Sequence, residues 1–177
     1  MARGLDAIRA VGPDSWDELA ALLADAPGGC WCMWPRLPLG TMSERTAGQN
    51  REDARRIVRS GEPAGLLAYR DGKAIGWLAL APRSHFGRLS PAASSTWVIA
   101  CVYLAPQARG AGVLTGLLAG AIAHARSAGA TFLEAIPRGW RTDGGRPAMA
   151  SLRGALLSAG FEEVDPVALG VLFRRTI

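Results

Sequence analysis

Residues 96–115 read TWVIACVYLAPQARGAGVLT, and this stretch decides the fold because it joins a buried strand to a helix through a glycine-rich turn. The apolar first half predicts a central strand over 95–104, which Ala105-Pro106 would end. The spacing of the large apolar residues that follow predicts an amphipathic helix over 109–127. Its apolar stripe consists of Leu114, Leu117, Leu118, Ala121, Ile122 and Ala125.

The turn itself, Arg109-Gly-Ala-Gly112, predicts a site for a phosphate-bearing ligand. At the start of a helix the first backbone N–H groups lack partners within the helix, and the helix dipole adds partial positive charge. The two glycines let a phosphate approach the backbone, and Arg109 supplies a fixed cation. The alternative is a turn that only packs the helix against the sheet, but the strand before it and the helix after it favour diphosphate binding.

The rest of the chain predicts strands and helices around this central unit. We expect further strands at 5–11, 66–70, 73–80, 130–136 and 167–174. We expect further helices from Ser15 to the turn Ala26-Pro-Gly-Gly29, at about 46–60, and from Pro147 to Gly160. Strand 130–136 returns after a helix and should therefore lie parallel to strand 95–104. The sequence thus predicts one mixed α/β domain over residues 1–177, in which helices flank a central sheet.

Short local patterns refine this assignment. Ser15-Trp-Asp-Glu18 has the spacing of a capping box, so we expect the Ser15 and Glu18 side chains to cap the first helix. Asp71-Gly72 between two apolar runs predicts a hairpin with a type I′ turn. The segment 30–41, rich in Pro and Gly, predicts an ordered loop.

The composition is that of an ordinary globular chain with an excess of positive charge. Of the 177 residues, 49% are hydrophobic and 20% are charged, and the net charge is +5. Nine basic residues and only two acids, Glu134 and Asp143, lie between Gly72 and Phe161, which favours a polyanionic ligand.

The same composition argues against three classes of protein. We expect no nucleic-acid partner, because the sequence has no basic block, zinc-finger spacing or aromatic platform. We expect no membrane association, because no apolar run reaches about 18 residues. The N-terminus lacks a secretory apolar segment, so we expect a cytoplasmic protein.

The three cysteines are Cys30, Cys32 and Cys101. The one-residue gap in Cys30-Trp-Cys32 is shorter than the gap usual for paired zinc thiolates, and we expect no metal. We interpret the thiols as small buried hydrophobic groups, with a reactive or substrate-lining thiol as the alternative. A metal-binding or redox-active Cys-x-Cys module is a third interpretation.

Several short motifs together resemble the GNAT superfamily of N-acetyltransferases over nearly the whole chain. The turn motif is Pro106-x-x-Arg109-Gly-x-Gly112, and a later helix ends in Ala-Gly160-Phe161. Within the superfamily, the chain resembles a bacterial subgroup that has an N-terminal Cys-Trp-Cys-Met loop. The segments that carry this resemblance are Cys30-Trp-Cys-Met33, Asn50-Arg51, Gly65-Leu-Leu-Ala-Tyr69, Gly76-Trp77, Ala81-Pro-Arg83, Trp97 with Cys101, and Glu134-Ala-x-Pro137. The resemblance implies the GNAT fold, a mixed central sheet of about six or seven strands flanked by about four helices.

The resemblance also implies that acetyl-CoA is the cosubstrate and that it binds in two places. The main chain of Val102, Tyr103 and Leu104, at a bulged end of the central strand, would hydrogen-bond the pantetheine arm. The backbone amides at the helix start would hold the diphosphate; these belong to Arg109, Gly110, Ala111, Gly112, Val113, Leu114 and Thr115.

Two positions depart from the superfamily pattern. Leu114 stands where the pattern prefers Gly or Ala, so its side chain would either crowd the phosphate or point into the core. Leu156 stands where many members carry a Tyr that protonates the departing thiolate, so another donor or solvent must supply that proton.

For the chemistry we expect a general base and an oxyanion contact. Glu134 is the candidate base, because it ends the strand beside the expected bulge between apolar neighbours that would raise the pKa of its carboxyl. The alternative is a carboxylate that is paired with a nearby arginine such as Arg138. The main-chain N–H of Val102 is the candidate oxyanion donor. The Tyr103 hydroxyl is an alternative proton donor, although packing explains this residue equally well.

For the acceptor site we expect Trp31, Trp34, His85 and Trp97, with Trp77 and Trp140 as further aromatic candidates. Trp77 and Trp97 fall in strands, so core packing is their alternative, and His85 could be a solvated bystander. Arg51, Arg55, Arg56 and Arg59 share a helix face that is usually only solvated, with recognition of an acidic acceptor as the alternative.

The sequence therefore predicts an N-acetyltransferase that moves an acetyl group from acetyl-CoA to a primary amine of a small molecule or peptide. Because the sequence shows no clear nucleophilic residue, we expect the amine to attack acetyl-CoA directly in a ternary complex. Cys101 or Cys32 leaves open the alternative of a covalent acetyl-enzyme. The alternative is a non-catalytic acyl-CoA-binding sensor or interaction domain, which the Leu156 departure favours. Relatives often dimerise, so a homodimer is also open.

Overall fold

The computed structural model describes residues 4–24, 26, 28–38, 40–89, 95–137, 149–167 and 170–177. Within them seven strands form one sheet in the order β1-β2-β3-β4-β5-β7-β6. The strands are β1 Ala7–Ala10, β2 Leu66–Arg70, β3 Lys73–Pro82, β4 Thr96–Leu104, β5 Phe132–Ala135, β6 Glu162–Val167 and β7 Gly170–Thr176. The pairing of β4 with β5 is parallel and every other pairing is antiparallel, so the sheet is mixed, as the sequence predicts.

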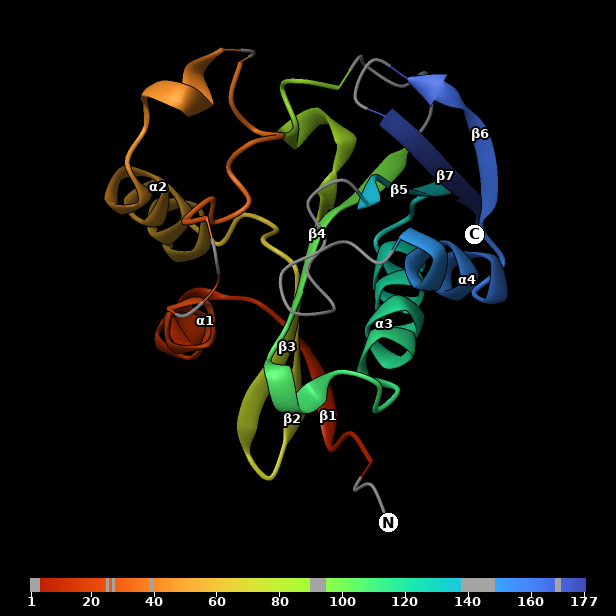
Figure 1. Ribbon diagram of the computed structural model, residues 1–177, viewed down its shortest axis with the longest axis horizontal. Helices are drawn as coiled ribbons and strands as arrows, with labels where there is room; N and C mark the ends of the chain where they lie inside the picture. The colour runs from red at the N-terminus through yellow and green to blue at the C-terminus, as the bar shows by residue number, and fades with distance from the viewer. Residues whose placement is uncertain are drawn as a thin grey trace.

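Four α-helices flank this sheet on both faces. They are α1 Trp16–Leu23, α2 Ala47–Arg59, α3 Val113–Ser127 and α4 Met149–Ser158. Figure 1 shows α1 and α2 on one side of the sheet and α3 and α4 on the other. Four short 3₁₀ turns connect the elements: Pro13–Ser15, Thr41–Glu44, Arg83–His85 and Pro106–Ala108. None of the described helices combines the length and apolarity needed to cross a bilayer.

The two faces of the sheet carry separate cores, because successive strand residues point to opposite sides. Ile99 of β4 packs with α3 and α4, whereas Val98 and Ala100 pack with α1, α2 and the loop that joins them. The apolar stripe predicted for α3 faces the first of these cores and is buried at five of its six positions. The sixth, Leu114, is half-buried against the same core.

The predicted hairpin is confirmed. Asp71 and Gly72 both have positive φ, +49° and +71°, as a type I′ turn requires. The parallel unit is also confirmed, since Thr96 lies opposite Phe132 and Ile99 opposite Ala135.

Three local expectations need correction. The capping box is wrong, because the Ser15 hydroxyl bonds to the Gly12 backbone in the preceding 3₁₀ turn and the Glu18 carboxylate accepts from the Tyr69 hydroxyl. The helix expected from residue 109 begins only at Val113, after a 3₁₀ turn and the two glycines. The single last strand expected at 167–174 is instead the antiparallel pair β6 and β7.

Candidate functional site

The glycine turn before α3 forms an open cradle of backbone donors. Gly110 and Gly112 have φ of +70° and +74°, and a Cβ built at either would meet nothing within 4 Å. The first backbone N–H groups of α3, from Val113 to Thr115, point out of the helix start without partners inside the helix. No acidic residue lies in this first turn to compete for them. The cradle therefore combines open space, free donors and the positive end of a helix dipole.

The side chains of Arg109 and Leu114 lie on either side of the glycine turn in sequence and differ in their surroundings. The Nε atom of Arg109 is buried and, among the described residues, has no hydrogen-bond partner. A buried guanidinium N–H without a partner is costly, so this donor is suited to an anion that binds here. Leu114 packs against the core on the α3 face, so it points away from the cradle rather than into it.

The end of β4 that leads to this cradle is buried, but no described strand pairs with one of its two edges. β5 pairs with β4 only from Thr96 to Ile99, and the last contact is the Ile136 N–H on the Ile99 carbonyl at 3.0 Å. β4 then continues to Leu104 beside β3 alone, so the sheet splits at this point.

The direction of the free donors follows from strand geometry. The Ala105 N–H donates to the Ile75 carbonyl of the hairpin strand β3 at 3.0 Å. Since peptide groups alternate along a strand, the N–H groups of Val102 and Leu104 face the opposite side, where β5 has ended.

A bulge in β4 sets which side chains lie beside this split. Ala79 is opposite Cys101 and Leu80 is opposite Ile99, so Ala100 is an extra residue in β4. A bulge shifts the alternation of side chains by one residue. Cys101 and Tyr103 therefore join the face of α1 and α2, while Val102 turns to the other core. This is the bulged strand end that the family resemblance implies.

A pocket of about 180 Å³ opens on this face beside the bulge. Its lining comes from the bulged strand, from Trp77 of β3, from the end of α1 and from the loop after α1. The lining residues are Leu23, Ala26, Gly28, Gly29, Cys30, Trp31, Cys32, Trp34, Trp77, Cys101, Val102 and Tyr103. Because Val102 belongs both to the pocket and to the free edge of β4, the pocket and the split meet at this residue.

The loop wall of the pocket is tightly coiled. Trp31 and Cys32 have φ of +49° and +55°, a left-handed conformation that non-glycine residues rarely adopt. In this coil the Met33 N–H donates to the Cys30 carbonyl at 2.9 Å, and the backbone donors of Cys32, Met33 and Trp34 favour the thiolate form of Cys30. The strained backbone thus positions a thiol and two indoles around one cavity.

All three cysteines are free thiols and all three line the pocket. Burial raises the pKa of the Cys30 thiol, although its three backbone donors oppose that shift. Burial raises the pKa of Cys32 well above its usual value, and a hydrogen bond with the Cys101 thiol adds to the shift. Cys30 and Cys32 are therefore protonated at neutral pH, which agrees with their interpretation as small hydrophobic groups, while their place in the pocket lining agrees with the alternative of a substrate-lining thiol.

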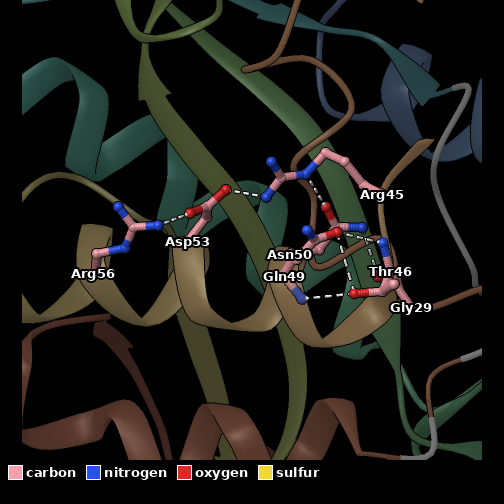
Figure 2. Close-up of polar contacts among 7 residues, drawn as sticks. All are labelled: Gly29, Arg45, Thr46, Gln49, Asn50, Asp53 and Arg56. Atoms are coloured by element: carbon pink, nitrogen blue, oxygen red, sulfur yellow. Dashed lines mark hydrogen bonds and ion pairs between the residues drawn. The ribbon is translucent and has the colours of Figure 1, made fainter. Parts of the chain in front are cut away.

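Helix α2 holds this loop in place. The Asn50 side chain, only 3% exposed, donates to the Gly29 carbonyl at 3.1 Å and accepts from Arg45 Nε at 2.8 Å. Figure 2 shows Asp53 at the centre of the next contacts, between Arg45 and Arg56, and the Thr46–Gln49 capping box at the helix start.

Arg51 adds a second anchor for the loop. Its guanidinium lies 5.5 Å from the ring centre of Trp16 and 5.7 Å from that of Trp31, so it joins α1, α2 and the loop. The arginine face of α2 is therefore not merely solvated. Arg55 pairs with Glu52, Arg56 pairs with Asp53, and Arg51 packs on indoles.

Glu134 lies deep in the sheet rather than in the pocket. Its side chain is 1% exposed, its Oε2 accepts from Arg83, and its Oε1 accepts from Arg174 Nη2 at 2.7 Å. Both oxygens are engaged, and Glu134 is not among the residues that line the pocket. The geometry favours the alternative of a paired carboxylate, with Arg83 and Arg174 as partners; Arg138 lies outside the described residues.

The structure brings some of the predicted acceptor residues together and separates others. Trp31 and Trp34 line the pocket. Trp97 packs in the opposite core, where its ring meets His124 edge to face at 5.5 Å. His85 lies 3.5 Å from a Glu62 carboxylate oxygen and does not line the pocket. Trp140 lies outside the described residues.

Sequence reasoning missed Asn50 and Arg51 as residues that position the pocket, and it left the role of Cys101 open. Asn50 and Arg51 are among the residues that resemble the bacterial subgroup. No local pattern indicates, however, that they contact a loop about twenty residues earlier in the chain. Leu156, the other departure from the pattern, is fully buried in the α3 core, so its position offers no proton donor.

Comparisons with known proteins place this geometry in context. Residues 16–143 match the family described as Acetyltransferase (GNAT) family. No curated protein matches the chain by sequence.

Solved structures of other acetyltransferases share the fold. A ribosomal-protein-alanine N-acetyltransferase from Brucella melitensis has 22% identity and a TM-score of 0.61, covering 97% of this chain and 99% of its own. A polyamine N-acetyltransferase from Drosophila melanogaster has 11% identity and the same TM-score, covering 97% and 99%. A PaiA N-acetyltransferase from Thermoplasma acidophilum in complex with coenzyme A has 13% identity and a TM-score of 0.57, covering 97% and 98%. At these identities the likeness establishes the fold.

Proposed function

Because this chain belongs to the GNAT family of acetyltransferases, we propose that it transfers the acetyl group of acetyl-CoA to a primary amine by direct attack in a ternary complex. One observation carries this proposal. The open cradle at the start of α3, with the unpartnered Nε of Arg109, follows directly in the chain from the free edge of β4.

The described residues fit acetyl-CoA at both ends of this arrangement. The backbone donors from Gly110 to Thr115 would hold the diphosphate, with Arg109 as the side-chain cation. The backbone N–H of Arg109, which the sequence also suggests as a donor, instead donates to the Pro106 carbonyl at 3.4 Å. The main chain of Val102 and Leu104 would hydrogen-bond the pantetheine arm along this edge of β4, whereas the Tyr103 main chain, which the sequence also suggests for this role, faces β3. The thioester would then lie where the edge meets the pocket, beside Val102.

In the reaction the neutral amine attacks the thioester carbonyl, and negative charge develops on the carbonyl oxygen. The Val102 N–H would stabilise this oxyanion, and such a fixed donor is worth about 3 kcal/mol of barrier. The carbon–sulfur bond then breaks, the thiolate leaves, and the attacking nitrogen passes its proton to water. With Leu156 buried in the core, we propose that water or the Tyr103 hydroxyl returns a proton to the thiolate.

A second candidate is the acyl-CoA-binding sensor without catalysis. It is favoured by the apolar residue at 156 and by the engagement of both Glu134 oxygens with arginines, which leaves the usual acid and base roles unassigned. The two candidates agree on the cofactor site and differ only in turnover.

Calorimetry with coenzyme A and a thiol-release assay with primary amines test the proposal. We expect coenzyme A to bind, and Arg109→Ala to weaken binding about tenfold or more because a charge-assisted contact to phosphate is lost. Steady thiol release with at least one amine is expected for the enzyme. Binding without turnover over aliphatic, aromatic and peptide amines would establish the sensor instead, and the absence of binding would refute both.

A further inference from the structure

We infer that the amine acceptor is an aromatic primary amine that is already neutral at pH 7, such as an arylamine. The inference deepens the proposed function and rests on it, since it takes the pocket beside Val102 as the acceptor site. It is carried by the lining of that pocket and by what the lining lacks.

The pocket is small and mostly apolar. At about 180 Å³ it is below the usual range of roughly 300–1,000 Å³ for drug-sized ligand sites, so it has room for about one ring. Three indoles surround it, from Trp31, Trp34 and Trp77, and the strand side contributes the Tyr103 ring. Such walls contact a flat aromatic ring over a large area.

None of the described residues that line the pocket carries a carboxylate, an imidazole, an amine or a guanidinium. The titratable groups in the lining are the three thiols and the Tyr103 hydroxyl. The Cys30 and Cys32 thiols hold their protons at neutral pH, because burial raises the pKa of each. Glu134, the candidate base that the sequence suggests, accepts hydrogen bonds from Arg83 and Arg174 on both of its carboxylate oxygens.

Because none of the described lining residues is a base, the protonation state of the amine itself decides which amines can react. An alkylamine with a pKa near 10.4, like that of lysine, is neutral in only about one molecule in 2,500 at pH 7. A charged ammonium would have to enter an apolar cavity without a counter-charge and lose its proton without an acceptor, which is costly. An arylamine carries no charge at pH 7 and meets neither cost.

Aromatic rings can also bind cations, so an ammonium held by cation–π contacts is the competing acceptor. Here the Trp31 ring already has the Arg51 guanidinium over it at 5.7 Å. A second cation at this ring would be repelled by the first. The aromatic lining therefore favours a neutral ring over an ammonium.

The test compares aniline, benzylamine and spermidine as acceptors with the same acetyl-CoA-saturated protein. Aniline and benzylamine carry the same ring and differ by one methylene, but only benzylamine is an ammonium at pH 7. We expect kcat/KM at pH 7 to be at least tenfold higher for aniline. We also expect it to be flat from pH 6 to 8 for aniline and to rise about tenfold per pH unit for benzylamine.

Benzylamine or spermidine equal to or better than aniline would overturn the inference and leave the proposed acetyl transfer intact. Binding of acetyl-CoA with no amine acetylated would overturn the inference and favour the sensor. The absence of acetyl-CoA binding would remove the proposed function itself.

A matched pair of variants tests the missing base directly. Ala26 lines the pocket and is half-buried, so Ala26→Asp adds a carboxylate, while Ala26→Asn adds the same volume without charge. We expect A26D to raise the benzylamine-to-aniline ratio of kcat/KM about tenfold over A26N, because the carboxylate can pair with and deprotonate an ammonium. Equal ratios in the two folded variants would contradict the argument from neutrality.

Discussion

Glu134 illustrates how burial changes the meaning of a residue. A strand-end carboxylate between apolar neighbours has the sequence character of a general base. In the folded chain it accepts from Arg83 on one oxygen and from Arg174 on the other. A base must reach the proton that it removes, whereas this carboxylate is surrounded by the sheet and two guanidinium groups.

We therefore predict that Glu134→Ala lowers the free energy of unfolding by about 3 kcal/mol, because it leaves the mostly buried Arg83 cation without its counter-charge. Chemical denaturation measures this loss. Glu134→Gln, which keeps the shape, is the matched variant for activity, and we expect kcat within about threefold of the parent. A fall in kcat of tenfold or more at unchanged stability would return Glu134 to the role of base.

The thiols give a prediction for pH. Cys30 and Cys32 have pKa values raised above the ordinary 9.0, so the folded chain keeps protons that the unfolded chain releases above about pH 9. The free energy of unfolding should therefore fall as the pH rises past 9. Denaturation between pH 8 and 10.5 measures the slope, which should be shallower in Cys32→Ala.

The same shift predicts slow chemistry at these thiols. At pH 8 we expect iodoacetamide to alkylate Cys30 and Cys32 at least tenfold more slowly in the folded protein than in denaturant, because the thiolate is the reactive form. Mass spectrometry of the peptides reports each site. Fast native alkylation at Cys30 would show that its three backbone donors outweigh its burial.

At the scale of elements, the start of α3 affects stability and is the proposed binding site for the diphosphate. Its first turn has no acidic residue, although a carboxylate there would stabilise the helix. We predict that Thr115→Glu raises the free energy of unfolding by about 0.5 kcal/mol through the helix dipole and weakens coenzyme A binding at least tenfold by repelling the diphosphate. Thr115 is exposed, so the change should not disturb the core.

Thr115→Gln controls for side-chain size in this experiment. Calorimetry and thermal unfolding on both variants separate the two effects. A Glu variant that binds coenzyme A as tightly as the Gln variant would mean that the diphosphate does not lie at this helix start.

How far the sequence determined these elements depended on whether the signal was local. Asp71-Gly72 fixed its hairpin because the turn chemistry lies in two adjacent residues. The capping box at Ser15 failed because Gly12 competed for the hydroxyl and Tyr69, 51 residues from Glu18, took the carboxylate. β6 was missed because its sequence EEVDPV is polar and contains a proline, which an edge strand tolerates.

The candidate site was also predictable only where its residues are adjacent in the sequence. The cradle at Arg109 could be predicted because the strand, the glycines and the helix are contiguous. The pocket could not, because Cys101 meets the Cys30 loop only through a one-residue bulge in β4, and no sequence pattern announces which residue bulges. The face of the sheet on which Trp97 lies was unpredictable for a related reason, because the alternation of strand residues does not say which of them face the pocket.

At the scale of the whole molecule, the two faces of the split sheet hold different parts of the candidate site. β4 is joined to β5 by four residue pairs, Thr96 to Ile99, and beyond them no described strand pairs with this edge. One core fixes α3 and its glycine cradle, and the other fixes the thiol and indole pocket. The free edge of β4 lies between the two, so a ligand that spans cradle and edge would contact both halves.

This arrangement predicts how coenzyme A affects the entire chain. At 100 times its Kd, a ligand that binds only the folded state adds about 2.7 kcal/mol to the free energy of unfolding. For a chain of this size that corresponds to a rise in Tm of about 5–11 °C. In hydrogen exchange we expect protection at two separated places, the N–H groups of Val102 and Leu104 and those of residues 113–115, because these backbone N–H groups would bind the ligand.

The Thr115→Glu variant provides the control, since it should lose protection at both segments together at the same coenzyme A concentration. Protection confined to 113–115 in the parent would mean that the ligand holds the helix start without reaching the edge of β4. In that case the thioester would not be carried to Val102, and the cradle would bind an anion unrelated to acetyl transfer. Joint protection is expected because a single extended ligand must cross from the cradle to the split.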